Sequence, residues 1–194
     1  NQGGIDIAGM FKASFQSLDS FMKHESELDT YAYLVIDRSL RSTGSREGAR
    51  MADILRLEID AKNIMIIERL KKHGADRGRR MSSPLRGGNI GESTLNKLIE
   101  AKGLAATSSL ARHKFPKLSV SADEHELGRL EIALEKAISA QRLDAFYTST
   151  LSIGVLIGFL LLKEEEVGNL RKIAKGKEFR MGEEQIRDML VLSG

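Results

Sequence analysis

Two helical stretches of the sequence each carry an acidic side chain three positions before an asparagine. Asp60 precedes Asn63 in LRLEIDAKNIMII, Glu166 precedes Asn169 in LLLKEEEVGNLRKI, and 106 residues separate the two copies. Residues three apart share one helix face, where a carboxylate and an amide can bond each other or cap a neighbouring element. Two interpretations of the pair remain open: a polar anchor at an interface, or a buried pair that fixes how a neighbouring segment packs. The second is favoured, because buried groups of this kind usually satisfy nearby backbone.

Neither pair has the surroundings of a catalytic centre. No histidine, lysine or serine nucleophile is tied to these carboxylates by its spacing. The chain contains no cysteine, which excludes thiolate metal sites and a cysteine nucleophile. The four histidines lack the i, i+4 spacing with a carboxylate partner that is typical of a metal site: His24, His73, His113 and His125. We therefore expect no catalytic residue, no cofactor and no metal ion, and a chain that is not an enzyme.

A basic, glycine-rich segment at residues 74–91 is the second candidate site. Its sequence, GADRGRRMSSPLRGGNIG, has no apolar periodicity and predicts an exposed loop. Lys71 and Lys72 precede four arginines, opposed only by Asp76: Arg77, Arg79, Arg80 and Arg86. Glycine would let the backbone approach a phosphate, but the segment offers no aromatic ring for base stacking and no P-loop lysine. Three interpretations of residues 71–86 remain open: a solvated loop, a contact with a protein or membrane surface, or nucleic-acid binding.

Long helices must position both candidate sites. The 194 residues include two prolines and no tryptophan, and leucine, isoleucine, alanine, glutamate, lysine and arginine fill the long segments, which favours an all-α fold. Patterns of apolar residues predict helices at 5–24 and 27–40, one from Ser45 to Gly74, and two more that break within 148–152, the second ending at Gly176. The most apolar run, residues 151–162, is shorter than the roughly 20 residues of a membrane span and predicts a buried helix.

Other landmarks also recur along the chain. Leu28, Asp29 and Tyr31 match Leu143, Asp144 and Phe146, and each half closes with a glycine and a short helix, GESTLNKLI and GEEQIRDML. The pattern predicts two internally repeated helical units, one at residues 1–105 with the basic loop 74–91, and one at 106–194. Duplicated helical units more often build scaffolds than catalytic centres.

Two strings give the sequence a family resemblance. EIDAKNI at residues 58–64, followed by Arg69, and EVGNLRKIAKG at 166–176 resemble the C subunit of the archaeal and bacterial A/V-type rotary ATPases, whose eukaryotic relative is the d subunit of the vacuolar proton pump. The resemblance implies an all-helical, funnel-shaped fold of three related units. Two of these are recognisable here, which indicates a fragment or a short member, and the absence of an initiator methionine favours a fragment.

The same resemblance implies a non-catalytic part of the central stalk. Such a protein would couple the axle, made of the D and F subunits, to the membrane proteolipid ring of a proton- or sodium-translocating machine, while other subunits handle ATP. It would be cytoplasmic and peripheral to the membrane, with no span of its own and no nucleic-acid partner. The repeated structural or interface motif would comprise Glu58, Asp60, Asn63, Arg69, Glu166, Asn169, Leu170 and Arg171, and the arginines of loop 74–91 would form a possible contact loop.

Overall fold

The computed structural model describes residues 18–116, 118, 127–148 and 153–192. Every regular element in these ranges is an α-helix, which confirms the predicted all-α fold. The elements are α2 (Leu18–Ser42), α3 (Arg46–Lys72), α4 (Arg77–Ser82), α5 (Glu92–Glu100), α6 (Gly103–Ala111), α7 (Leu127–Thr148), α8 (Ile153–Glu178) and α9 (Glu183–Met189).

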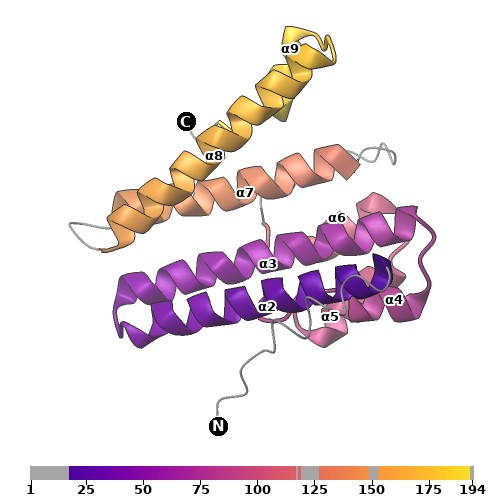
Figure 1. Cartoon of the computed structure of the whole chain (residues 1–194), viewed down its shortest axis with the longest axis horizontal. Helices are drawn as coiled ribbons and strands as arrows, with labels where there is room; N and C mark the ends of the chain where they lie inside the picture. The colour runs from indigo at the N-terminus through magenta and orange to yellow at the C-terminus, as the bar shows by residue number, and fades with distance from the viewer. Residues whose placement is uncertain (1–17, 117, 119–126, 149–152, 193–194) are drawn as a thin grey trace.

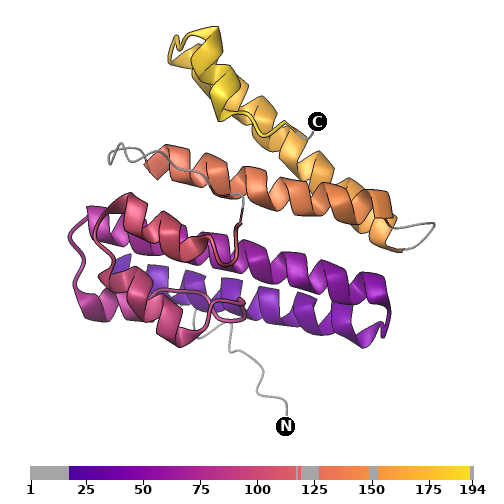
Figure 2. The same ribbon diagram turned by 180° about the vertical axis from the view of Figure 1, so that it is seen from behind.

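The four long helices lie side by side in the order α2, α3, α7 and α8 (Figure 1). The short helices α4, α5 and α6 cover one face of the α2–α3 pair, as the view from behind shows (Figure 2). Helix α9 lies at the far end of α8 and packs against it (Figure 1). Helix α3 is therefore enclosed by neighbours on several sides, whereas α8 lies at the margin of the described part of the chain. The prediction that the apolar run 151–162 forms a buried helix is wrong in part, because Leu156 and Leu160 of α8 are 60% and 57% exposed.

Helix α3 begins and ends where the sequence predicts. The Ser45 side chain accepts a hydrogen bond of 2.9 Å from the backbone N–H of Gly48 and caps the start of the helix. Gly74 follows the end with φ of +67°, the left-handed conformation that glycine adopts without a steric penalty. Local capping chemistry thus accounts for both ends of the helix.

Two predicted helix ends are wrong. The break expected between residues 24 and 27 is absent, because α2 continues from Leu18 to Ser42. Ser26 lies inside it and donates its hydroxyl to the carbonyl of Ser83 instead of capping a new helix. Helix α8 likewise continues past Gly176 to Glu178. A Cβ at Gly176 would lie 2.6 Å from Cγ1 of Ile186, so this glycine permits α9 to pack closely on α8.

Two buried clusters hold the long helices together. The larger cluster joins α3, α5, α6 and α7, with Leu98, Leu130 and Ile64 all fully buried. A smaller one contains Met51, Ile54 and Ala145, with side chains of α2 and α8 packed around it. Because the larger cluster draws on both sides of the boundary at 105/106, the two predicted units share one core, and their division stays a prediction.

Ion pairs tie the helices together at the edges of these clusters. Asp37 of α2 accepts two hydrogen bonds from the guanidinium of Arg56 on α3, of 2.8 and 3.0 Å.

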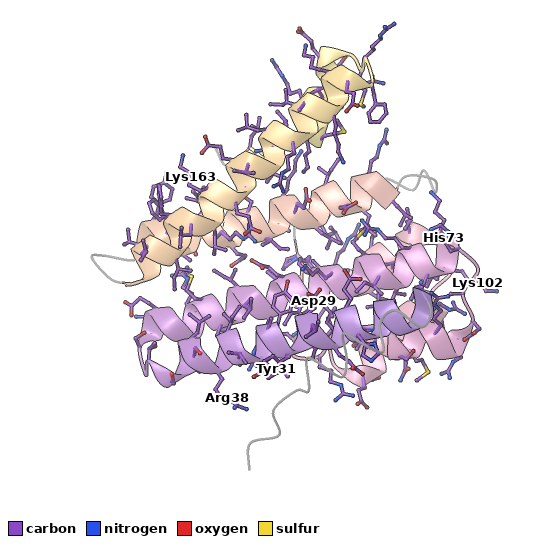
Figure 3. All side chains as sticks on the ribbon, viewed as in Figure 1. Asp29, Tyr31, Arg38, His73, Lys102 and Lys163 are labelled. Atoms are coloured by element: carbon purple, nitrogen blue, oxygen red, sulfur yellow. The ribbon has the colours of Figure 1, made fainter. Side chains whose placement is uncertain are left out.

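Side chains of the described helices appear in Figure 3, where Asp29, Tyr31 and Arg38 mark α2 and Lys163 marks α8. None of the helices in the described part of the chain combines the length and apolar character that a membrane span needs.

Candidate functional site

Asp60 and Asn63 lie side by side on α3 and are almost completely buried, with 0% and 2% of their surface exposed. They do not bond each other. The Asn63 side chain donates to the carbonyl of Leu85 at 2.9 Å and accepts from its N–H at 2.6 Å. Asp60 accepts the backbone N–H groups of Asn89 at 3.0 Å and of Ile90 at 2.9 Å. The pair therefore replaces the hydrogen bonds that residues 85–90 would otherwise make with water.

These contacts fit the interpretation of a structural anchor rather than of an exposed interface anchor. Burial raises the pKa of Asp60, and the two backbone N–H donors and the positive charge of Lys114 oppose that rise. Both oxygens of the carboxylate are engaged by backbone N–H groups of the chain itself.

The glycine pair at 87–88 serves the same anchor, and the sequence interpretation missed it. A Cβ at Gly88 would lie 2.2 Å from Oδ1 of Asp60, and Gly87 has φ of +102°. A side chain at Gly88 would push the segment away from the carboxylate. The signal was the Gly-Gly step in the basic segment, which suggests a close backbone approach.

The second copy repeats the asparagine contact but not the acidic one. Asn169 donates to the carbonyl of Val191 at 2.6 Å and accepts its N–H at 3.0 Å, across the same 22 residues as Asn63 and Leu85. Glu166 is exposed and pairs with Lys163 on its own helix. The two acids thus occupy matching positions in different surroundings.

The turns that follow α3 and α8 also match. Gly74 and Arg180 both have positive φ, and both lie two residues after their helix. Ala75 donates its N–H to the carbonyl of Leu70, as Met181 does to that of Gly176, each bond being 2.9 Å long. These parallels support the predicted duplication locally, and the repeat of whole units stays a prediction.

The other motif residues connect helices or face solvent. Glu58 of α3 accepts hydrogen bonds from Nε and Nη2 of Arg142 on α7, at 3.0 and 2.6 Å, in a pair whose side chains are mostly buried. Arg69 pairs with Glu131 of α7 at 2.7 Å on the surface. Leu170 is 58% exposed, and its neighbour Arg171 is exposed as well.

The prediction of an exposed loop at 74–91 is wrong in part. Residues 77–82 form α4, whose N-cap Asp76 accepts the N–H of Arg79 at 2.8 Å. Leu85 and Ile90 are buried. Their backbone N–H groups can leave water because Asn63 and Asp60 of α3 accept hydrogen bonds from them. Apolar periodicity could not reveal this segment, since side chains elsewhere hold it.

The four arginines of this segment do not form one free cationic patch. Arg77 pairs with Glu100 at 2.7 Å, and Arg80 donates to the carbonyls of Ile99 and Asp76. Arg86 is exposed, with its backbone N–H directed to Thr30. Arg77 and Arg80 therefore tie α4 to α5, which reduces the cationic surface that the sequence suggested.

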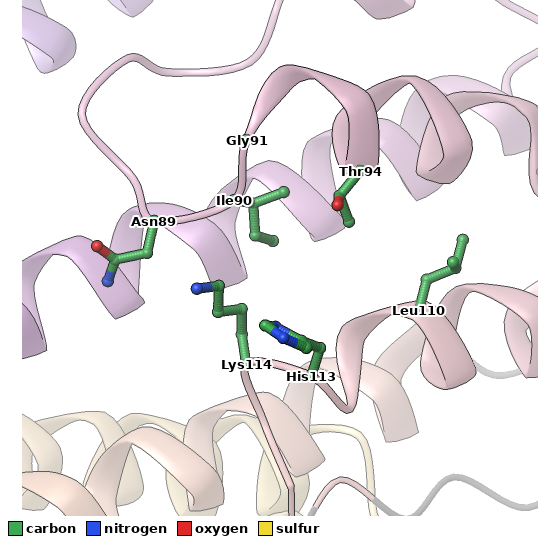
Figure 4. Close-up of a pocket in the computed structure, with 7 residues that line it drawn as sticks. All are labelled: Asn89, Ile90, Gly91, Thr94, Leu110, His113 and Lys114. Carbon is green, nitrogen blue, oxygen red and sulfur yellow. The ribbon is translucent and has the colours of Figure 1, made fainter.

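A pocket of about 220 Å³ opens beside the start of α5 (Figure 4). Its lining residues are Asn89, Ile90, Gly91, Thr94, Leu110, His113 and Lys114. It lies directly over the segment that Asp60 holds. Across the described ranges there is no group of three or more histidine and acidic side chains that could hold a metal ion. We assign no catalytic role to this pocket.

Comparison with known proteins supplies the family. The model of the ATP synthase (C/AC39) subunit family matches residues 3–189. Similar curated proteins include the C subunit of the A-type ATP synthase of Methanococcoides burtonii, 27% identical over 87% of this chain and 48% of that protein. Those of Methanosarcina mazei (25%, 93% of this chain and 56% of that protein) and Pyrococcus abyssi (27%, 89% and 49%) are also similar.

The chain spans about half the length of these curated relatives. No solved structure matches it significantly. The family match, covering nearly the whole sequence, agrees with an all-helical chain and with the resemblance carried by EIDAKNI and EVGNLRKIAKG. The chain therefore belongs to the ATP synthase (C/AC39) subunit family.

Proposed function

We propose that the chain acts as a non-catalytic coupling part of a rotary ATPase, between the central axle of the D and F subunits and the membrane proteolipid ring. The single observation that carries this proposal is the family match over residues 3–189. Its relatives are named as subunits of A-type ATP synthases, so the proposed site of action is the cytoplasmic surface of such a complex.

Physical properties of the described helices support a role in transmitting force. A coupling part must resist deformation, and α3 is held by buried clusters, by the Asp60–Asn63 anchor and by ion pairs to α2 and α7. Close-packed interiors of this kind transmit strain instead of absorbing it. The buried motif residues would then maintain the geometry of the binding surface, and only the exposed ones could contact the partner: Arg69, Glu166, Leu170 and Arg171.

Reconstitution tests this proposal. The purified chain is mixed with the D–F subcomplex and, separately, with the proteolipid ring in detergent, and association is followed by size-exclusion chromatography. We expect a stable complex with at least one of them, and no ATP hydrolysis by the chain alone. If the chain shows its full helical signal by circular dichroism and binds neither, the proposal is wrong.

The same preparation separates this function from binding to an anionic surface. Replacing Arg77, Arg79, Arg80 and Arg86 with alanine should leave the association with the stalk or the ring in place. An acidic partner bound through the segment would instead show a weaker salt dependence after the replacement, because fewer counterions are released.

A further inference from the structure

The basic side chains of the protein are concentrated in one part of the chain. Residues 68–116 contain eleven lysine and arginine side chains and four acidic ones, although the whole sequence has 30 and 27. In the rest of the chain the acidic residues are in excess, by 23 to 19. Residues 68–116 comprise the end of α3, the short helices α4, α5 and α6, and the segments beside them. The positive charge of the protein thus lies on its short-helix layer.

Four helix ends of this layer meet around one ion pair. Arg77 at the start of α4 pairs with Glu100 at the end of α5, at 2.7 Å. Helix α6 begins three residues after Glu100, and its Thr107 donates to Glu68 near the end of α3, also at 2.7 Å. The end of α3, the start of α4, the end of α5 and the start of α6 therefore lie together, at one end of the α2–α3 pair (Figures 1 and 2).

Three exposed lysines lie around this junction. Lys72 is the last residue of α3, Lys102 directly precedes α6, and Lys97 lies three positions before Glu100 on the same face of α5. Among the residues that the structure describes, none forms an ion pair or a hydrogen bond with the side chains of these three lysines. Lys102 and His73, the residue after Lys72, mark this region in Figure 3. We call the surface formed by Lys72, Lys97 and Lys102 the basic end.

The acidic side chains close to the basic end are engaged by other partners. Glu68 is 5% exposed and pairs with Lys71 at 2.6 Å. Glu100 pairs with Arg77, and Asp76 caps the start of α4. The charges of the three lysines are therefore left for solvent or for an anionic partner to balance.

An exposed apolar side chain accompanies these charges. Met81 is 46% exposed and lies four residues after Arg77, on the same face of α4. No residue of α4 is buried, so the whole helix lies on the surface. Cations beside an exposed apolar group have the chemistry of a peripheral membrane contact, in which the cations meet lipid headgroups and the apolar group enters the interface.

We infer that the basic end binds the surface of a lipid bilayer that contains anionic phospholipids. Its three lysines contact the headgroup phosphates, and Met81 enters the boundary between headgroups and acyl chains. A nucleic acid would find no ring for its bases to stack on, because Phe115, the one aromatic residue of the sequence 68–116, is 1% exposed. This inference goes beyond the proposed function and requires neither the axle nor the ring.

Vesicle flotation tests the inference. The full chain is incubated with vesicles of phosphatidylcholine alone, or of phosphatidylcholine mixed with phosphatidylglycerol, over a series of salt concentrations. We expect the chain to float with the mixed vesicles and not with phosphatidylcholine alone. The bound fraction should fall as salt rises, because salt screens the attraction between the lysines and the anionic headgroups.

Matched variants locate the contact. Replacing all three lysines of the basic end with glutamine should weaken vesicle binding about tenfold or more, because each basic side chain at an anionic surface contributes a few-fold. Met81→Gln should weaken it a few-fold without changing its salt dependence, since an apolar contact is lost and no charge is. The control makes the same change of net charge at three exposed lysines of α7 and α8 and should leave binding almost unchanged: Lys136, Lys175 and Lys177. Circular dichroism checks that each variant keeps its helical signal.

Four results would overturn the inference. The first is the absence of binding to the mixed vesicles by a folded chain at low salt. The second is equal weakening by the two sets of lysine replacements, which would make net charge and not the basic end responsible. The third is release of the chain by inorganic phosphate at an ionic strength at which chloride has no effect, which would indicate a site for free phosphate. The fourth is binding of single-stranded RNA through the same lysines more tightly than of vesicles.

Discussion

Replacing each repeated asparagine with alanine should produce two different losses of stability. Asn63 holds both backbone polar groups of Leu85, and the two residues are buried, with 2% and 5% of their surface exposed. Asn63→Ala leaves one N–H and one C=O inside the protein without partners. Asn169 makes the same two bonds to Val191, which is as buried as Leu85 with 4% of its surface exposed. Asn169 itself is only half-buried, so water can enter the space that its side chain leaves.

The magnitude follows from these contacts. Each unsatisfied buried group costs about 1–3 kcal/mol, and alanine recovers a few tenths through its higher helix propensity. We expect Asn63→Ala to lower the free energy of unfolding by about 3 kcal/mol, which for a chain of this size lowers Tm by roughly 6–12 °C. Asn169→Ala should cost about 1 kcal/mol, since water that enters in place of the half-buried side chain can bond the N–H and C=O of Val191.

Urea unfolding followed by far-ultraviolet circular dichroism measures both losses. Hydrogen exchange adds a local readout, because the amide of Leu85 should lose its protection in Asn63→Ala. Asn89→Ala is the control, since that side chain is exposed and only its backbone N–H is bound by Asp60. Equal losses for the two asparagines, or a loss for Asn63→Ala no greater than for the control, would refute the reasoning.

Three further predictions concern other parts of the structure. Gly176→Val should lower the free energy of unfolding by about 1–3 kcal/mol, because the new side chain would force Ile186 and α9 away from α8. Gly168→Ala, with open space around its Cβ, should raise it by about 1 kcal/mol through the higher helix propensity of alanine. Thermal melts of the two variants measure both changes. An NMR titration should find the pKa of Asp60 above its ordinary value of 3.8, because burial favours the protonated carboxyl. The contribution of this group to the free energy of unfolding is then complete below pH 3.8 and is lost as pH rises through the pKa of the folded protein. A measured pKa below 3.8 would contradict this prediction. The hydrogen bond from Arg56 lowers the pKa of Asp37. The contribution of Asp37 to the free energy of unfolding is therefore present above pH 3.8 and is lost as pH falls through the pKa of the folded protein. In urea titrations, the difference in stability between wild type and Asp37→Asn should become smaller as the pH is lowered.

Much of the helical architecture could be predicted because local chemistry determines it. Ser45 and Gly74 identify the ends of α3 through capping alone. Gly176 misled the prediction, since a glycine near a helix end resembles a stop and its true role depends on Ile186 on another helix. Tertiary contacts of this kind leave no periodic signal in the sequence.

The anchor was half predictable for a similar reason. Sequence spacing placed Asp60 and Asn63 on one helix face and favoured a structural role, but it could not identify residues 85–90 as the partner. That segment has too few apolar residues to show a period, and its fold depends on hydrogen bonds from α3. The arginines of α4 illustrate the opposite error, because composition counts charges without showing that Arg77 and Arg80 are engaged by α5.

The acid–asparagine pattern also shows how position within the fold decides what a repeated motif does. Asp60 is fully buried because α3 lies in the middle of the molecule and residues 85–90 lie across it. Glu166 has the same place in the repeat on a helix with one open side, and there it remains a solvated surface charge beside Lys163. A carboxylate that is costly to bury is retained on α3 because backbone donors satisfy it, and on α8 nothing has to satisfy it.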